Sequence, residues 1–188
     1  QTSNKSINFT HIEYDSVSGS VYLGAVNWVY QLGANDLQVE RAFRTGPIRD
    51  SPFCAPADCS GVAESNLVIP TNNVNKVLLV EPYARMLIVC GSVHQGACSR
   101  HRLEDISVHE NLVPIPVVSN DENSSTVAFI GPARYSSVQL TPILYVAATN
   151  SRAGHYRDMV PAISGRYLES GSRLFNIIEH GFASARVD

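Results

Sequence analysis

The sequence predicts an all-β protein in which antiparallel sheets of about four strands recur along the chain, as in a β-propeller. Three observations support this fold class. Val and Ile, which favour strands, are abundant, and no segment has the pattern of a helix of ordinary length. The chain also carries 12 Gly and 10 Pro, a density of turn formers that suits many short strands. Finally, similar strand pairs return at intervals of about 60 residues.

The expected strands are short apolar segments separated by turn residues. Gly and Pro mark the turns, for example at residues 18–20, 81–85 and 131–132, because they interrupt regular pairing. Two short segments, 102–109 and 173–180, are the best helix candidates. In chain order, strands are expected at Phe9 to Tyr14, Val21 to Val26, Trp28 to Leu32, Leu37 to Phe43, Val77 to Glu81, Met86 to Cys90, Ala97 to Leu103, Thr126 to Ile130 and Ile143 to Ala148.

Three of these strands resemble one another, since each is apolar and ends in a pair of small residues. Leu23, Val89 and Val146 hold equivalent positions, which lie 66 and 57 residues apart. Small residues at one strand end fit a propeller, because its sheets crowd together near the central channel. About three sheets cannot close a ring of at least four, so we expect a piece of a larger domain. The alternative that the pattern leaves open is a β-sandwich, which would make the chain a secreted module of structural or carbohydrate-binding type.

Composition and charge argue against several classes of function. Apolar residues make up 44% of the 188 residues, which is enough to build a core. The net charge of −3 argues against a general nucleic-acid binder or a protein held at membranes by basic residues. The longest unbroken apolar run, residues 86–90, is far shorter than the ~20 residues of a membrane-spanning helix.

The sequence contains no recognisable catalytic or cofactor-binding motif. No Ser or Cys lies in a nucleophile turn, and no glycine-rich phosphate loop is present. Asp105, Asp121 and Glu122 are acidic, but no loop offers the alternating oxygen ligands of a dedicated calcium site. We therefore expect no enzyme activity, no cofactor and no bound metal.

The four cysteines fall into two close couples, Cys54 with Cys59 and Cys90 with Cys98. Four cysteines allow three connectivities, and sequence alone does not choose among them. The spacing favours pairing within each couple. The first couple spans a proline-containing loop, and the second spans an expected hairpin whose facing positions lie within disulfide reach.

A metal site competes with the second of these disulfides. Cys90, His94, Cys98 and His101 place two thiols and two imidazoles close together, which is the ligand set of a structural zinc site. Their spacing lacks the two-residue step of a zinc knuckle, so the disulfide is favoured. A solvated turn and strand face is the simpler explanation of the two histidines.

Three Asn-x-Ser/Thr sequons occur, at Asn4, Asn8 and Asn123. Asn123 is the strongest glycosylation candidate, because residues 120–125 form a continuous polar stretch typical of an exposed loop. Close cysteine couples, sequons and only two lysines together favour an extracellular protein with both disulfides formed.

From about Phe9 onward, five stretches of the sequence are distinctive as a set. They are FTHI at 9–12, GAVNWVYQL at 24–32, TGPIRDSPFC at 45–54, NNVNKVLLV at 72–80 and CGSVHQGAC at 90–98. With these stretches the chain resembles the N-terminal part of the sema domain of the plexin family. The stretch IGPARY at 130–135 is similar to an invertebrate plexin.

The resemblance implies the first two to three blades of a seven-bladed sema-type propeller with four-stranded antiparallel blades. The blades are expected at about 15–70, 71–120 and 121–188, each with its connection. The family implies the ectodomain of a single-pass receptor on the extracellular side of the plasma membrane, with its membrane segment outside this chain. It also implies a semaphorin as protein ligand, axon-guidance type signalling and possible self-association of the receptor, with no nucleic acid as partner. Finally, it implies pairing of the cysteines within each couple.

The resemblance further implies where a ligand docks. Plexins bind semaphorins along the propeller edge, largely around the third and fourth blades, and two stretches fall at matching places. Arg152, Tyr156 and Arg157 lie in the loop expected after the third repeat, and Phe182 with Ala183 lies in a segment where an aromatic residue contacts the ligand. Phe182 is the main expected anchor, because a central aromatic commonly carries much of the binding energy. The alternatives are a core position for Phe182 and a merely solvated loop for the others.

Overall fold

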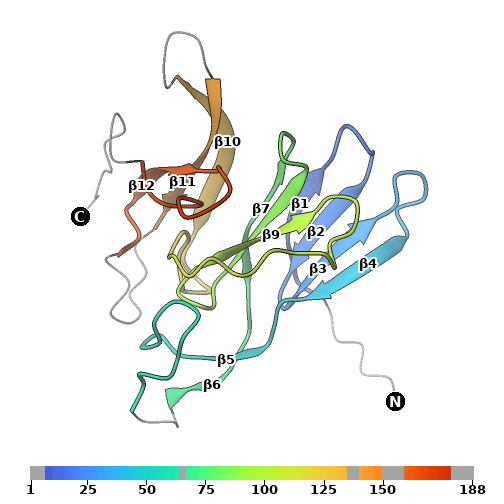
Figure 1. Ribbon diagram of the computed structural model, residues 1–188. Coiled ribbons are helices and arrows are strands. Elements are labelled where there is room, and N and C mark those ends of the chain that lie inside the picture. Colours follow the sequence, from blue (N-terminus) through green and yellow to red (C-terminus); the bar gives the residue numbers. More distant parts are fainter. Residues whose placement is uncertain (1–6, 64–66, 135–139, 150–158, 179–188) are drawn as a thin grey trace, which may run out of the picture.

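The computed structural model describes residues 7–63, 67–134, 140–149 and 159–178 (Figure 1). Within these residues the chain forms twelve β-strands and no α-helix, which confirms the predicted all-β class. In chain order the strands are β1 (Phe9–Tyr14), β2 (Val21–Ala25), β3 (Trp28–Leu32), β4 (Val39–Arg44), β5 (Ile48–Asp50), β6 (Ile69–Thr71), β7 (Asn75–Glu81), β8 (Met86–Gly91), β9 (Cys98–Arg102), β10 (Thr126–Arg134), β11 (Leu140–Ala148) and β12 (Ile163–Tyr167).

The strands form three main antiparallel sheets and one small one. The first sheet has four strands in the order β1-β2-β3-β4, and consecutive strands pair antiparallel throughout. The second and third sheets have the orders β7-β8-β9 and β10-β11-β12. Strands β5 and β6 pair separately, in the connection between the first two main sheets.

Isolated backbone bridges occupy the fourth strand position of the second and third sheets. Cys98 of β9 bridges Val113, and a second bridge joins β9 to His109. In the third sheet, Arg166 of β12 bridges Ile177. The chain therefore returns along the outer edge of each sheet, as in the four-stranded first sheet, without forming a regular strand there.

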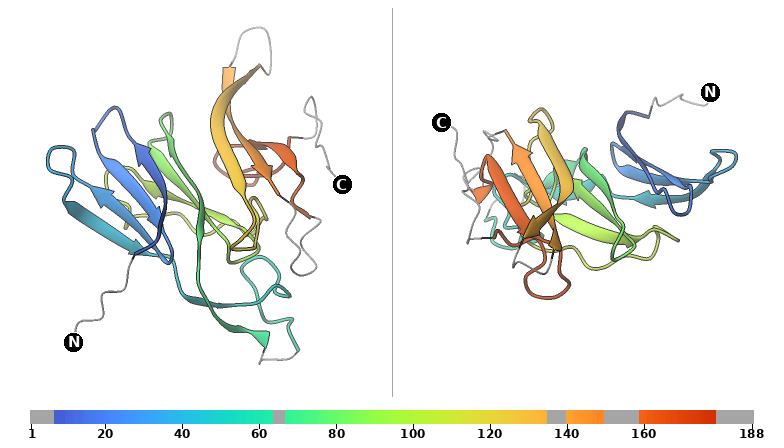
Figure 2. Two further views of the ribbon diagram at one scale, coloured as in Figure 1. Left: turned by 180° about the vertical axis from the view of Figure 1, so that it is seen from behind. Right: turned by 90° about the horizontal axis from the view of Figure 1, so that it is seen from above.

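The three main sheets meet one another through their first strands. Strand β7 lies between β1 and β10 and contacts both. Seen from above, the sheets fan out from this line instead of stacking as two layers (Figure 2). This is the arrangement of neighbouring propeller blades, so the β-sandwich alternative is wrong. The predicted blade ranges stay a prediction, although the first sheet already begins at Phe9, ahead of residue 15.

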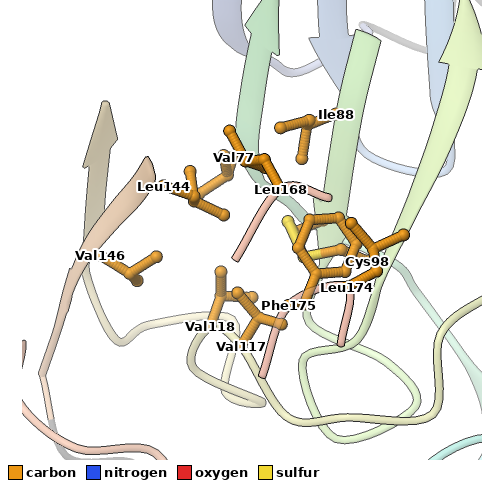
Figure 3. Close-up of a cluster of buried hydrophobic side chains, with 11 residues drawn as sticks. Val77, Ile88, Cys98, Val117, Val118, Leu144, Val146, Leu168, Leu174 and Phe175 are labelled. Atoms are coloured by element: carbon orange, nitrogen blue, oxygen red, sulfur yellow. A yellow bond between two sulfur atoms is a disulfide. The ribbon is translucent and has the colours of Figure 1, made fainter. Parts of the chain in front are cut away.

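Strand β8 is buried along its whole length because the middle sheet is covered on both faces. Side chains alternate along a strand, so successive residues of β8 point to opposite sides. Leu87 and Val89 pack with Tyr22 of the first sheet, whereas Ile88 and Cys90 pack toward the third sheet. This second cluster is shown in Figure 3 and comprises Val77, Ile88, Cys90, Cys98, Val117, Val118, Leu144, Val146, Leu168, Leu174 and Phe175.

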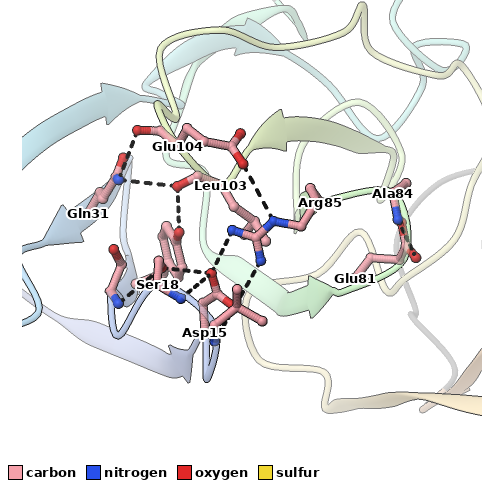
Figure 4. Close-up of polar contacts among 11 residues, drawn as sticks. Asp15, Ser18, Gln31, Glu81, Ala84, Arg85, Leu103 and Glu104 are labelled. Atoms are coloured by element: carbon pink, nitrogen blue, oxygen red, sulfur yellow. Dashed lines mark hydrogen bonds and ion pairs between the residues drawn. The ribbon is translucent and has the colours of Figure 1, made fainter.

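Polar contacts also join the first sheet to the second (Figure 4). In the turn between β7 and β8, Arg85 donates from Nη1 to Asp15 Oδ1 at 3.1 Å, and its Nη2 lies 2.9 Å from Asp15 Oδ2. Tyr22 Oη donates to the Leu103 carbonyl at 2.6 Å, and Gln31 Nε2 donates to the same carbonyl at 3.2 Å. Each bond satisfies a group that water cannot readily reach, which avoids the cost of burying it unpaired.

Most of the sequence-predicted strands lie where the structure has strands. β1 and β3 have the expected bounds, while β10 runs on to Arg134 and β11 begins earlier, at Leu140. Neither helix candidate is helical in its described part, because residues 102–109 form a turn that bridges back to β9. No helix in the described ranges is long and apolar enough to cross a membrane.

Candidate functional site

The residues predicted to contact a protein ligand lie outside the described residues, in segments 150–158 and 179–188. The structure does describe the chain before and after segment 150–158 and the chain that leads into segment 179–188. It also describes the sheet to which these parts of the chain are attached. The five predicted contact residues are Arg152, Tyr156, Arg157, Phe182 and Ala183.

The chain on both sides of segment 150–158 is attached to the third sheet or to the loop before it. Thr149 N donates to the Ser125 carbonyl at 2.9 Å, and Ser125 N donates to Thr149 Oγ1 at 2.8 Å. Ala148 N donates to the Ala162 carbonyl at 3.0 Å. The segment therefore connects the end of β11 to the start of β12, and both attachment points are held by backbone hydrogen bonds.

The chain that leads into segment 179–188 is attached to strand β12. Ile178 N donates to the Gly165 carbonyl of β12 at 2.9 Å, and the Ile178 side chain is buried against Ile143. Both predicted contact segments therefore adjoin β12, so the third sheet fixes the points from which they depart.

Arg100 ties the loop after β12 to the second sheet. Its buried guanidinium donates to both carboxylate oxygens of Glu110, at 2.8 Å each. It also donates to the Leu168 carbonyl at 3.3 Å and to Ser170 Oγ at 2.9 Å. Bidentate arginine–carboxylate pairs are geometrically specific, so Glu110 fixes the guanidinium, and the guanidinium in turn holds the loop through Leu168 and Ser170. Sequence reasoning missed Arg100, because nothing in the sequence distinguishes it from the other arginines.

Two of the three predicted glycosylation sites fall in the described residues, and both are exposed. Asn8 directly precedes β1, and Asn123 lies in the turn before β10, while Asn4 lies outside the described residues. The buried Lys76 ammonium donates to the Glu122 carbonyl at 2.7 Å and to the Ser124 carbonyl at 2.8 Å. Lys76 therefore holds the turn through the residues directly before and after Asn123.

The cysteines are joined within their couples. The structure contains one disulfide between Cys54 and Cys59 and a second between Cys90 and Cys98, which face each other across β8 and β9. The zinc alternative is therefore wrong, because its two thiols are bonded to each other. In the described part of the chain, one cluster of metal-ligating types remains, Asp50 beside the first disulfide. Disulfide sulfurs are not thiolates, so this cluster lacks the ligands of a zinc site.

Burial sets the protonation of the histidine between the first two sheets. Burial lowers the pKa of His101 to about 4, against the opposing effect of its hydrogen bond to the Ile106 carbonyl. His101 Nδ1 lies 2.7 Å from that carbonyl, and Phe43 of β4 meets the imidazole edge-on at 4.6 Å between ring centroids. His101 is thus a neutral interface residue at physiological pH, in place of the solvated strand residue that we expected.

Comparison with curated proteins finds plexins among the relatives of this chain, although no protein-family model matches it. Human Plexin-B1 is 41% identical over 166 residues, which cover 84% of this chain and 7% of the relative. Rat Plexin-A3 is 44% identical over 97 residues, which cover 52% of this chain and 5% of the relative. The chain therefore spans a small part of the length of these relatives.

Solved structures agree with the sequence comparison. The full extracellular region of Plexin A4 superposes with a TM-score of 0.74 at 32% identity, over 94% of this chain and 19% of that chain. Drosophila Semaphorin 2a superposes with a TM-score of 0.53 at 15% identity, over 78% of this chain and 24% of that chain. The second likeness shows a shared fold alone. The first places the three sheets within an ectodomain of known architecture.

Proposed function

The chain belongs to the plexin family, and on that premise we propose that it is part of an extracellular receptor head that binds a semaphorin. The observation that carries the proposal is the match to the Plexin A4 extracellular region over 94% of the chain. The proposed location is the ectodomain of a single-pass receptor, and the proposed role is signalling of the axon-guidance type. Self-association of the receptor stays a prediction.

The proposed mechanism is rigid presentation of a docking edge. β11 and β12 belong to a sheet whose inner face is buried in the cluster of Figure 3, so their positions are fixed before a ligand arrives. Segment 150–158 is held on both sides and the chain leading into segment 179–188 is held at Ile178. Segments with fixed attachment points lose less conformational entropy on binding than unattached chain does, and this loss is a main cost of association. We propose that segments 150–158 and 179–188, which adjoin this sheet, form the semaphorin contact and that Phe182 is its anchor.

Both exposed sequons fit an extracellular protein. Asn8 and Asn123 lie on exposed turns or strand ends, as a bulky glycan requires. We propose that Asn123 is glycosylated, because its asparagine is exposed and its turn is held by Lys76. No catalytic step is proposed for this chain, and its function is the recognition of another protein.

The proposed ligand contact is tested by the substitution Phe182→Arg in the intact ectodomain. Loss of a central aromatic anchor should weaken binding of the cognate semaphorin by about tenfold or more, as measured by surface plasmon resonance. The matched control is Tyr83→Arg, which changes an aromatic that is 78% exposed in the turn between β7 and β8, where Arg85 pairs with Asp15 beside the first sheet. If Phe182→Arg and Tyr83→Arg both leave the affinity unchanged, the assignment of Phe182 is rejected.

A further inference from the structure

Arg166 of β12 is a fully buried cation with an incomplete set of partners. Its exposed fraction is 0%, and burial lowers the pKa of its guanidinium to about 10. Nε donates to Ser164 Oγ at 3.0 Å, and Nη1 donates to the Phe175 carbonyl at 2.9 Å. Nη2 is buried and has no hydrogen-bond partner. A buried charged donor without a partner is costly, so a partner for Nη2 is expected.

Other arginines in the described ranges show what the missing partner would be. The buried Arg100 has the carboxylate of Glu110, and Arg85 has the carboxylate of Asp15. Arg166 forms no ion pair with any residue that the structure describes, and both of its acceptors are neutral oxygens. Among the described residues, Arg100 and Arg85 therefore each have a carboxylate partner, and Arg166, the most deeply buried of the three, has none.

Arg166 is one of the residues that line a cavity of about 500 Å³, and it is covered by other side chains there. Arg173 also lines the cavity, with its guanidinium 5.9 Å from the centre of the Tyr167 ring. Among the described residues, the lining includes two arginines and no acid, and Ile115 and Met159 are apolar members of it. Arg173 and Met159 are exposed and have long side chains, so they can move aside to admit a ligand to Arg166.

We propose that this cavity binds the carboxylate of an acidic peptide segment, with Nη2 of Arg166 and the guanidinium of Arg173 as its donors. A guanidinium matches the planar geometry of a carboxylate, and the apolar walls suit the hydrocarbon part of a side chain or its neighbour. The volume is that of a site for an organic ligand, larger than a lone inorganic anion needs. The bound segment belongs to a protein partner, and the site does not depend on that partner being a semaphorin.

The proposal is tested by calorimetric titration of the intact ectodomain with short peptides. The probe is N-acetyl-Leu-Asp-Phe-amide, and its control is the Asn isostere, which keeps the shape and removes the charge. The Asp peptide should bind at least about tenfold more tightly, because charge-assisted hydrogen bonds are stronger than neutral ones. Inorganic sulfate forms the third arm, and it should bind more weakly than the Asp peptide.

Two substitutions locate the binding. Arg173→Gln changes an exposed residue and should lower the affinity for the Asp peptide by about tenfold without altering the fold. Arg102→Gln, at an exposed arginine of β9, is the matched control and should have no effect. Arg166→Met should abolish binding, and its circular dichroism spectrum shows whether the sheets still form.

Three outcomes would overturn the proposal. Equal affinity for the Asp and Asn peptides would remove the role of the charge, and binding of sulfate alone would indicate an adventitious ion only. The third outcome is binding that appears only in the variant Asp158→Asn/Glu179→Gln, which would mean that the chain fills the site with its own acid. None of these results bears on semaphorin affinity, which is measured separately with Phe182→Arg.

Discussion

At the scale of single residues, the joint between the first and second sheets depends on a few buried polar groups. Asp15 accepts hydrogen bonds from Arg85, from Ser18 Oγ at 2.7 Å and from the Val17 amide at 3.1 Å. Burial would raise the pKa of Asp15, but the hydrogen bonds from Arg85 and Ser18 lower it to about 2. The fold therefore favours the charged carboxylate, and this contribution is lost only as the pH falls from about 3.8 toward 2.

Asp15→Asn should destabilise this joint by about 2 kcal/mol, because it removes the buried carboxylate that accepts from Arg85, which keeps only its contact with the exposed Glu104. Hydrogen exchange of β2 and β8 amides in the intact protein measures the loss. Asp105→Asn is the matched control, since the Asp105–Arg41 pair is 3.5 Å apart and largely exposed. An exposed pair contributes less than about 1 kcal/mol, so equal effects of the two changes would contradict the argument.

His101 gives the same joint a second pH dependence, in a different range. An unfolded histidine binds a proton near pH 6.5, whereas the folded one does so only near pH 4. The stability contributed by neutral His101 is therefore complete above pH 6.5 and falls as the pH drops toward 4. The loss is about 3 kcal/mol over this window.

Hydrogen exchange of β9 amides at pH 7 and pH 4.5 should show this loss in the wild type and a smaller one in His101→Gln. Glutamine can still donate to the Ile106 carbonyl, and it does not titrate. A pH dependence that is the same in both proteins would assign it to another group. Asp15 does not interfere, because its titration lies at lower pH.

At the scale of elements, the small residues at the strand ends have a specific steric cause. We expected crowding near the channel, and the structure shows asparagine side chains against two of the glycines. A Cβ on Gly24 would collide with the Asn75 side chain, and one on Gly91 would collide with that of Asn73. Asn73 Nδ2 in turn donates to the Thr45 carbonyl at 3.1 Å, which ties the connection between the sheets.

Gly91→Ala should lower the free energy of unfolding by about 2 kcal/mol, because overpacking at this position displaces Asn73. Gly61→Ala is the control, since a Cβ there meets nothing within 4 Å. Chemical denaturation followed by the fluorescence of Trp28, the single tryptophan of the chain, measures both variants. Equal stability of the two would show that Asn73 moves aside without cost.

The sequence predicted nine of the twelve described strands, and it missed β5, β6 and β12. β7 and β8 contain the continuous apolar runs 77–80 and 86–90 because both faces of their sheet are covered, and such runs are easy to recognise. β12 was missed because its buried positions include Ser164 and Arg166 in place of branched apolar residues. β5 and β6 were missed because each is three residues long and β6 contains Pro70. The spacing of the cysteines favoured pairing within each couple, as the structure shows. No local pattern in the sequence marks Arg166 as buried.

At the scale of the whole molecule, the two end sheets expose apolar side chains, whereas the middle sheet is covered on both faces. In the first sheet Ile12 is 71% exposed and Tyr14 60%, and in the third Val127 is 68% exposed and Phe129 58%. Apolar side chains on one face of a sheet are normally covered by a neighbouring element. This pattern agrees with a chain that spans 19% of the Plexin A4 ectodomain chain that it matches.

Glycan shielding of the third sheet tests the proposed semaphorin-binding edge most directly. Arg152→Thr converts residues 150–152 into the sequon Asn-Ser-Thr, and Ser16→Asn creates the sequon Asn-Val-Ser in the exposed turn between β1 and β2. With both glycans shown to be attached by mass spectrometry, semaphorin binding to the intact ectodomain should be lost with the first and retained with the second. Undiminished binding with a glycan on Asn150 would contradict the account.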